Sequence, residues 1–169
     1  MRELGQLRIV IVAVVVMLGA CTPAATVTTG GTAMTVAAAP AEPTDNMMIS
    51  ANSLTWSDFQ PAGFDPGAKI AVFHGDPSKA GDYVLRLRFP DGYKFPVHYH
   101  PGGEHLTVLS GTFYLAMGNS GDWSQVKTYM PGDFIFAPAL HPHYGGAKGV
   151  TEIQLHGEGP FGLILGSPK

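Results

Sequence analysis

The sequence predicts an all-β protein with one folded domain. From Ala68 onward, short runs rich in Val, Ile, Leu, Phe and Tyr alternate with clusters of Gly, Pro and Asp. Several runs alternate strictly between apolar and polar residues, as at 84–89, and this period of two is typical of a half-buried strand. Turn residues return at short intervals, which favours a barrel or sandwich over a βαβ arrangement. The sequence shows no helical periodicity of useful length.

The expected strands follow this pattern in order. AKIAVF at 68–73 comes first, and YVLRLRF at 83–89 places its arginines on one face and its leucines on the other. The later strands are apolar runs flanked by turn residues: HLTVL at 105–109, TFYLAM at 112–117, FIFAPA at 134–139, VTEIQLH at 150–156 and FGLIL at 161–165. The segments GDPSKAGD, PDG, PGG, SG, GNSGD and MPGD supply the turns between them.

Residues 1–20 have the layout of a secretory signal peptide. Two arginines give a positive start, and the apolar run at 9–18 is shorter than the roughly 20 residues that span a bilayer. LGAC at 18–21 resembles the bacterial lipobox, in which Cys21 would become the lipidated first residue of the mature chain. An ordinary cleaved signal with an incidental cysteine is the alternative. We therefore expect an exported protein of the cell envelope, lipid-anchored to a membrane at its periplasmic or extracellular face.

The rest of the chain divides into a tether and a domain. Residues 21–47 are rich in Thr, Ala and Pro, so they cannot bury enough apolar surface to offset the entropy of ordering. Residues 48–169 have the length of one domain. A net charge of −3 gives no basic surface for nucleic acid. Cys21 is the only cysteine, which excludes an intrachain disulfide.

The densest polar cluster lies at residues 98–105, where three histidines and a glutamate precede an apolar segment. A buried imidazole or carboxylate needs a partner, and a metal ion is a natural partner for several of them together. Positions two apart on an extended strand point the same way, so His98 and His100 share a face. The same parity puts Glu104 and His105 on opposite faces of the next strand.

Two spaced motifs make the chain similar to the cupin family. In the first motif two histidines, a glutamate and two flanking glycines stand at the family spacing: Gly92, His98, His100, Glu104 and Gly111. The second motif has a glycine, a proline and a histidine: Gly132, Pro138 and His143. The chain departs from the family pattern at Leu140, where a second glycine is usual, and at Ala147, where an asparagine is common. The resemblance covers most of residues 68–165 and looks like small single-domain cupins of poorly defined activity.

The resemblance implies a single-domain cupin-type β-barrel, also described as a double-stranded β-helix or jelly-roll-like barrel, with a metal site inside it. The implied ligands are three imidazoles and one carboxylate: His98, His100, Glu104 and His143. Glu104 is also the candidate catalytic residue, since it could move protons. Such a site suits divalent Fe, Mn, Ni, Cu or Zn, and the sequence does not choose among them. Two alternatives stay open: a hydrogen-bonded cluster without metal, and His141 as the ligand in place of His143.

Five further residues are candidates for the pocket wall or for proton transfer: His105, Tyr114, His141, Tyr144 and His156. His105 is expected beside the ligands or on the outer face. For the tyrosines, packing in the barrel core is the alternative role. His74, which precedes GDPS, is expected in a turn.

Two functions are consistent with such a site. One is a metalloenzyme of the oxygenase type, dioxygenase-like, acting on a small-molecule substrate, with isomerase and decarboxylase chemistry still open. The other is a module that binds or senses a small ligand or a metal without turnover, and fold does not separate the two. A second copy of the chain, giving a homodimer, is a further candidate partner. GEGPFG at 157–162 lacks the βαβ unit of a dinucleotide site and predicts a turn.

Overall fold

The computed structural model describes residues 46–169, so the proposed signal peptide, Cys21 and nearly all of the tether lie outside the described residues. The described part contains two 3₁₀ turns, η1 (Ala51–Ser53) and η2 (Trp123–Gln125). Its strands are β1 (Ser57–Asp58), β2 (Lys69–His74), β3 (Gly81–Phe89), β4 (Lys94–Tyr99), β5 (Glu104–Met117), β6 (Lys127–Tyr129), β7 (Phe134–Ala137), β8 (His143–Gly159) and β9 (Ile164–Leu165). Within 46–169 there is no helix of the length and hydropathy needed to cross a membrane. The all-β prediction is confirmed.

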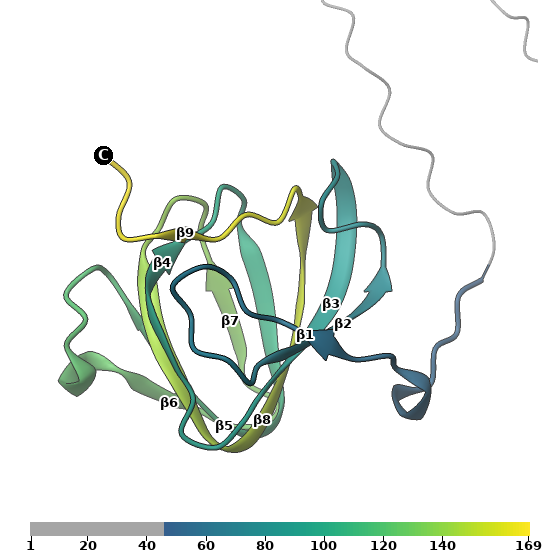
Figure 1. The fold of residues 1–169 in the computed structure, drawn as a ribbon, viewed down its shortest axis with the longest axis horizontal. Coiled ribbons are helices and arrows are strands. Elements are labelled where there is room, and N and C mark those ends of the chain that lie inside the picture. The colour runs from purple at the N-terminus through teal and green to yellow at the C-terminus, as the bar shows by residue number, and fades with distance from the viewer. Residues whose placement is uncertain (1–45) are drawn as a thin grey trace, which may run out of the picture. The chain divides into compact units, whose positions relative to one another are not determined.

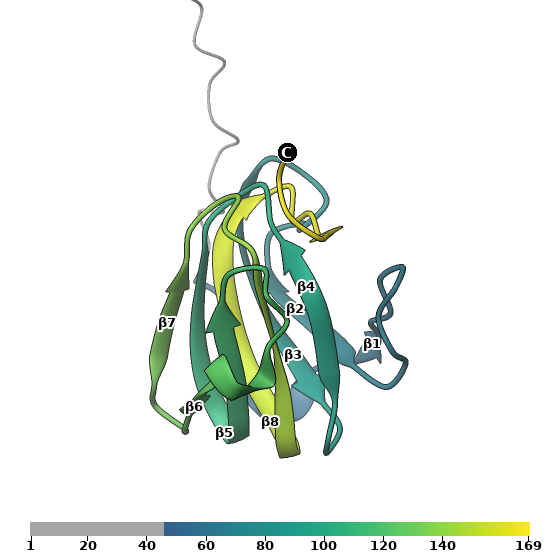
Figure 2. The same ribbon diagram turned by 90° about the vertical axis from the view of Figure 1, so that its left-hand side faces the viewer.

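Strand β8 is the centre of the sheet, because it pairs antiparallel with β3, β4 and β5 along its length. The main path runs β1-β2-β3-β8-β4-β9, and β6 and β7 join it through β5. Figure 1 shows β5 and β8 curving so that β3 and β4 rise on opposite sides. Figure 2 shows β7, β5, β8 and β4 side by side as one wall. The sheet therefore curls into a half-open barrel.

Strand β5 is longer than the sequence pattern suggested. The expected strands at 105–109 and 112–117 form one strand, because the intervening Ser110 and Gly111 make a bulge instead of a turn. Gly111 has a φ of 74°, and a Cβ at this position would collide with Thr151. Glycine is needed here because it reaches positive φ without a side-chain clash. The bulge bends β5 and lets the strand continue across the barrel.

The core lies inside the curl. The inward positions alternate along the strands, with Tyr83, Leu85, Leu87 and Phe89 all buried on β3. Alternating residues of β5 and β8 are buried against them. Full burial of each such side chain contributes roughly 1.5–3 kcal/mol. The candidate ligands of the sequence analysis lie on this same inner face.

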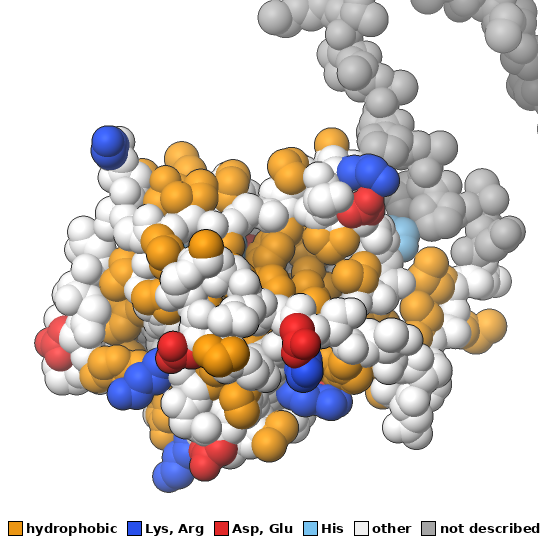
Figure 3. Space-filling model, viewed as in Figure 1, with side chains coloured by type: hydrophobic (Ala, Val, Ile, Leu, Met, Phe, Trp, Pro, Cys, Tyr) orange, Lys and Arg blue, Asp and Glu red, His pale blue; other side chains and the backbone are white. Residues whose placement is uncertain are grey.

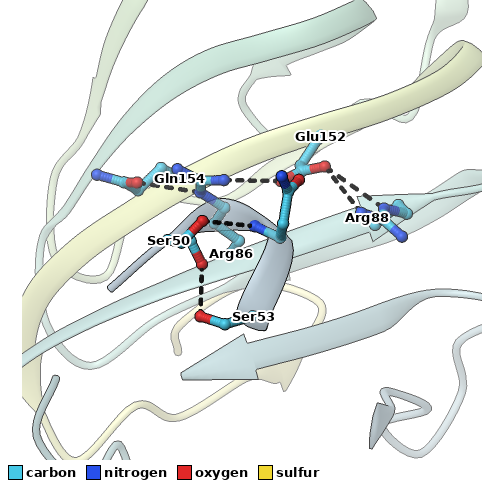
Figure 4. A network of polar contacts seen from close by, with 7 residues as sticks. Ser50, Ser53, Arg86, Arg88, Glu152 and Gln154 are labelled. Carbon is cyan, nitrogen blue, oxygen red and sulfur yellow. Dashed lines mark hydrogen bonds and ion pairs between the residues drawn. The ribbon is translucent and has the colours of Figure 1, made fainter. Parts of the chain in front are cut away.

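A polar network covers part of the outer face (Figure 4). Arg86 and Arg88 alternate with the buried leucines of β3, as the sequence pattern predicted. Both donate to Glu152 on β8, each at 3.2 Å, and Arg86 also donates to Gln154 at 3.2 Å. The Arg88 guanidinium lies 4.0 Å from the Trp56 ring centroid. The outer face therefore pairs its charges with each other.

Leu140 occupies the turn that precedes β8. It is the one non-glycine residue of the described part with positive φ, at 59°. Its backbone N–H donates to the carbonyl of His100 at 2.8 Å. The leucine thus adopts the left-handed conformation that the glycine of the family motif would reach without strain. Leucine in place of the usual glycine therefore leaves the backbone conformation of the turn unchanged.

Candidate metal centre

Three histidines from two strands meet inside the barrel. His98 lies near the end of β4, His100 follows that strand, and His143 begins β8. His98 and His143 are direct partners in the β4–β8 ladder, which brings together residues far apart in sequence. One ligand atom from each of the three rings lies within 4.8 Å of the others, and each residue is only 5% exposed. The three imidazoles therefore form a compact buried cluster.

Backbone carbonyls fix the tautomer of each ring. The Nδ1 atom of His98 lies 2.8 Å from the carbonyl oxygen of Pro96, and that of His100 lies 2.7 Å from that of Gly162. The Nδ1 atom of His143 lies 3.1 Å from the carbonyl oxygen of His141. A carbonyl can only accept, so each Nδ1 carries the hydrogen and each neutral ring keeps its lone pair on Nε2. Metal-binding histidines are commonly held in this way.

Burial keeps these rings neutral. It lowers the pKa of His98 to about 3 and that of His100 to about 4, and a neighbouring imidazole, His143, adds to both shifts. Burial also lowers the pKa of His143. Neutral imidazole is the form that ligates a metal.

Glu104 adds a carboxylate that the protein leaves partly unpaired. It is the first residue of β5 and is 3% exposed. Its Oε2 atom lies 3.3 Å from Nε2 of His100, whereas its Oε1 atom is buried without a hydrogen-bond partner. Burial raises the pKa of Glu104 to about 8. A cation in this position would pair with the ionised carboxylate, so the donor set fits a transition metal.

Aromatic rings surround the cluster. Phe64 and Phe95 meet His98 edge-on, with ring centroids 5.2 Å and 5.6 Å away. Phe161 stacks on His100 at 5.3 Å. These phenylalanines and the four candidate ligands line part of a cavity of about 50 Å³. Figure 3 shows a hollow between hydrophobic side chains on the face turned to the viewer.

Three groups near the site were not predicted from the sequence. Phe161 and the carbonyl of Gly162 come from the segment after β8, and a backbone carbonyl leaves no trace in a residue pattern. Tyr83 stands in one row with Gly157 and Glu104 across β3, β8 and β5. Its hydroxyl would be 3.0 Å from a Cβ at Gly157, so the missing side chain makes room for it. Burial, and then the charge of Glu104, raises the pKa of Tyr83.

The five other candidate pocket residues do not line this cavity. His105 and His156 are cross-strand partners on the outer face, and their rings stack at 4.7 Å. His141 contributes its carbonyl to His143, as described above. The buried Tyr144 donates its hydroxyl to the carbonyl of Asp122 at 2.8 Å. Tyr114 meets Trp123 edge-on at 6.5 Å.

His74, expected in a turn, is instead the last residue of β2. The run at 68–73 continues by one residue, and His74 pairs with Val84 of β3 after a bulge.

Comparison with known proteins supports the β-barrel fold. Residues 85–156 match the family model described as a cupin domain. Polyketide cyclase RemF from Streptomyces resistomycificus has a TM-score of 0.61 and 14% identity, over 72% of this chain and 85% of that one. A putative acetylacetone dioxygenase from Methylibium petroleiphilum PM1 has a TM-score of 0.57 and 20% identity, over 76% and 88%. A cupin 2 conserved barrel domain protein from Rhodopseudomonas palustris has a TM-score of 0.55 and 12% identity, over 72% and 86%.

No curated protein matches the sequence. At these identities the solved structures show the fold alone. Residues 85–156 match a cupin-domain model, and the predicted cupin-type β-barrel fold is confirmed. Three buried histidines of that domain lie close enough together to bind a metal.

Proposed function

We propose that His98, His100, Glu104 and His143 hold a divalent transition-metal ion, and that the domain acts on a small molecule beside it. One observation carries this proposal. Three buried neutral imidazoles have their Nδ1 atoms occupied by carbonyls and their ligand atoms within 4.8 Å of one another. The unpartnered oxygen of Glu104 lies in the same cavity and supplies the negative charge such an ion needs.

When bound, Fe, Mn, Ni, Cu or Zn would supply Lewis acidity, and the redox-active metals would also supply electron transfer. The chain itself supplies the side chains around the ion. Phe161 and Phe64 cover two of the imidazoles and exclude water from them. Glu104 is the only carboxylate among the described residues that line the cavity, so it is the side chain that could hold or release a proton there.

The enzymatic version of this proposal is a dioxygenase-like oxidoreductase. The fold is shared with proteins named as a polyketide cyclase and as a putative acetylacetone dioxygenase. The test is metal analysis of the full chain purified without chelator, followed by oxygen uptake with small aromatic and thiol substrates. Glu104→Gln should abolish uptake, whereas the matched outer-face change His105→Gln should not. If the protein takes up none of the five metals, the proposal is wrong.

A binding module is the second candidate, and one observation favours it. The residues considered for proton transfer, Tyr114, Tyr144 and His156, all lie away from the cavity. Glu104 is then the remaining candidate for proton transfer among the described residues that line the cavity. A carboxylate that ligates the ion is less free to move protons. A ligand that binds the metal-loaded protein and is recovered chemically unchanged would support this second function.

We also propose that the chain is exported and lipid-anchored through Cys21 to the cell-envelope membrane. The basic start, the short apolar run and LGAC support this proposal. One acyl chain binds membranes only marginally, so the mature protein should carry more than one. Cys21→Ser should move the protein from the membrane fraction to a soluble or unprocessed form. A native mature chain that begins elsewhere and fractionates as soluble would contradict it.

A further inference from the structure

The wall of the cavity beside the candidate metal centre is hydrocarbon. Apart from the four proposed ligands and Tyr93, it consists of aliphatic and phenylalanine side chains from several strands, among them Leu87, Phe113, Ile153 and Leu155. Within residues 46–169, no Lys, Arg, Asp, Ser, Thr, Asn or Gln side chain lines it. A ligand in this cavity therefore finds polar partners only at the metal centre.

The one further polar atom in the wall is already engaged. The hydroxyl of Tyr93 donates to the carbonyl of Asp65 at 2.8 Å. A polar ligand atom held against this wall without a partner costs roughly 1–3 kcal/mol, and an ionised group costs more. The wall thus discriminates against hydroxyls and charges on the body of a ligand.

The cavity is also small. Its volume is about 50 Å³, and a single water molecule needs roughly 10–15 Å³ of such space. Phe59, Phe161 and Leu163 form the part of the wall that is only partly buried. Phe59 and Phe161 pack against each other there, with ring centroids 6.3 Å apart. The space fits a molecule of few heavy atoms.

We propose that the ligand of this site is a small molecule with one metal-binding group and a hydrocarbon body that carries neither charge nor hydroxyls. The inference rests on the proposed function, since the ion supplies the partner for the polar group. Sugars, sugar phosphates and amino acids with polar side chains carry polar groups beyond one metal-binding head. They would leave those groups unpaired against Leu155, Phe95 and their neighbours.

Three hydroxamic acids with the same metal-binding head test the proposal. The full-length chain is loaded with Co(II), whose visible absorption reports both metal uptake and ligand binding. Butyrohydroxamic acid has a hydrocarbon body, succinic monohydroxamic acid carries a carboxylate, and gluconohydroxamic acid carries hydroxyls. The affinity for butyrohydroxamic acid should be at least about 10-fold higher than the affinity for either of the other two compounds.

A paired substitution sharpens the measurement. Leu163→Arg puts a cation at the partly buried side of the wall, and it should shift the affinity ratio toward the carboxylate compound by about 10-fold or more. Val150→Arg is the control, because Val150 is 62% exposed and does not line the cavity. It should leave the ratio unchanged.

The possible outcomes separate the two proposals. Failure of the wild-type chain to take up Co(II) counts against the metal centre itself. Uptake of Co(II) with equal or reversed affinities, or with no hydroxamate binding at all, leaves the metal centre intact and overturns the ligand class. A Leu163→Arg variant that binds Co(II) normally and keeps the wild-type ratio also counts against a selective wall.

Discussion

Two glutamates of this domain lie in the sheet with little exposure, and the protein treats them in opposite ways. Glu152 on the outer face has a side chain 16% exposed, and its two oxygens accept from Arg86 and Arg88 at 3.2 Å each (Figure 4). Glu104 on the inner face is 3% exposed, has only His100 at 3.3 Å, and keeps one oxygen without a partner. Residues 46–169 supply two arginines to the first carboxylate and no lysine or arginine to the second.

The difference indicates that Glu152 stabilises the fold, whereas Glu104 does not. An unpaired buried oxygen costs roughly 1–3 kcal/mol or more, which a purely structural residue would avoid. Glu104 carries this cost beside the neutral imidazole of His100, in the cavity that His98 and His143 also line. A metal ion removes the cost, since it supplies the positive charge from outside the chain. The unpaired oxygen of Glu104, in contrast to the fully paired Glu152, therefore supports a metal ion beside Glu104.

Neutralising each glutamate in turn should affect stability differently at the two positions. Glu152→Gln should lower the free energy of unfolding by about 1–2 kcal/mol with or without metal, because Arg86 and Arg88 lose their charged acceptor. Glu104→Gln should leave the metal-free protein at pH 8 as stable as wild type or more stable, because no charge is then buried. Chemical denaturation of the full chain measures both. Equal losses in the two variants would mean that the carboxylates have the same structural role.

The stability of the metal-free protein should depend on pH through both the buried histidines and Glu104. Burial lowers the pKa values of His98 and His100 below 6.5, so the unfolded chain binds more protons and stability is lost as the pH falls below that value. Burial raises the pKa of Glu104 from 4.5 to about 8, so the folded chain binds more protons and stability is lost as the pH rises toward and through 8. The melting temperature should therefore peak at about pH 6.5.

Two comparisons check this profile. Metal loading should remove the alkaline decline, since the ion pairs with the ionised carboxylate, and Glu104→Gln should remove it without metal. Glu152→Gln should retain it. A metal-free wild-type protein that gains stability steadily from pH 6.5 to 8.5 would show that Glu104 is not the group responsible.

A smaller effect is expected at the turn between β7 and β8. Leu140 has a φ of 59° and is 54% exposed, so its side chain contributes little packing while its backbone is strained. Leu140→Gly should raise the free energy of unfolding by about 0.5–1 kcal/mol after the entropy cost of glycine. The neighbouring change Ala139→Gly provides the control and should not stabilise the protein. Thermal unfolding that shows a loss for Leu140→Gly would mean that the side chain matters more than the strain.

The sequence could predict the parts of the fold and the site that depend on spacing. Strand parity separated Glu104 from His105, and the motif spacing selected His143 ahead of its neighbour His141. Those residues are brought together, or kept apart, as the spacing indicated. Metal ligation by them stays a prediction.

The remaining features depend on which strands become neighbours. Tyr83 reaches the row of Glu104 only through the register of β3, β8 and β5. The carbonyl of Gly162 contacts His100 from 62 residues away and has no side-chain signal. The turn signal at 110–111 was read as a strand end because a bulge and a turn both use glycine at positive φ. Local patterns carry no information about such long-range contacts.

Thermal unfolding of the full chain at pH 7.5, with and without chelator, tests the metal centre most directly. A metal at a hundredfold its dissociation constant stabilises the fold by about 2.7 kcal/mol, a shift on the order of 10 °C for a domain of this size. The account predicts that chelation lowers the melting temperature of the wild type, that His98→Ala and His100→Ala abolish the difference, and that the matched outer-face change His105→Ala preserves it. If the wild type melts identically in both states, after loading with Fe(II), Mn(II), Ni(II), Cu(II) and Zn(II) in turn, the histidines form a hydrogen-bonded cluster and the metal centre is wrong.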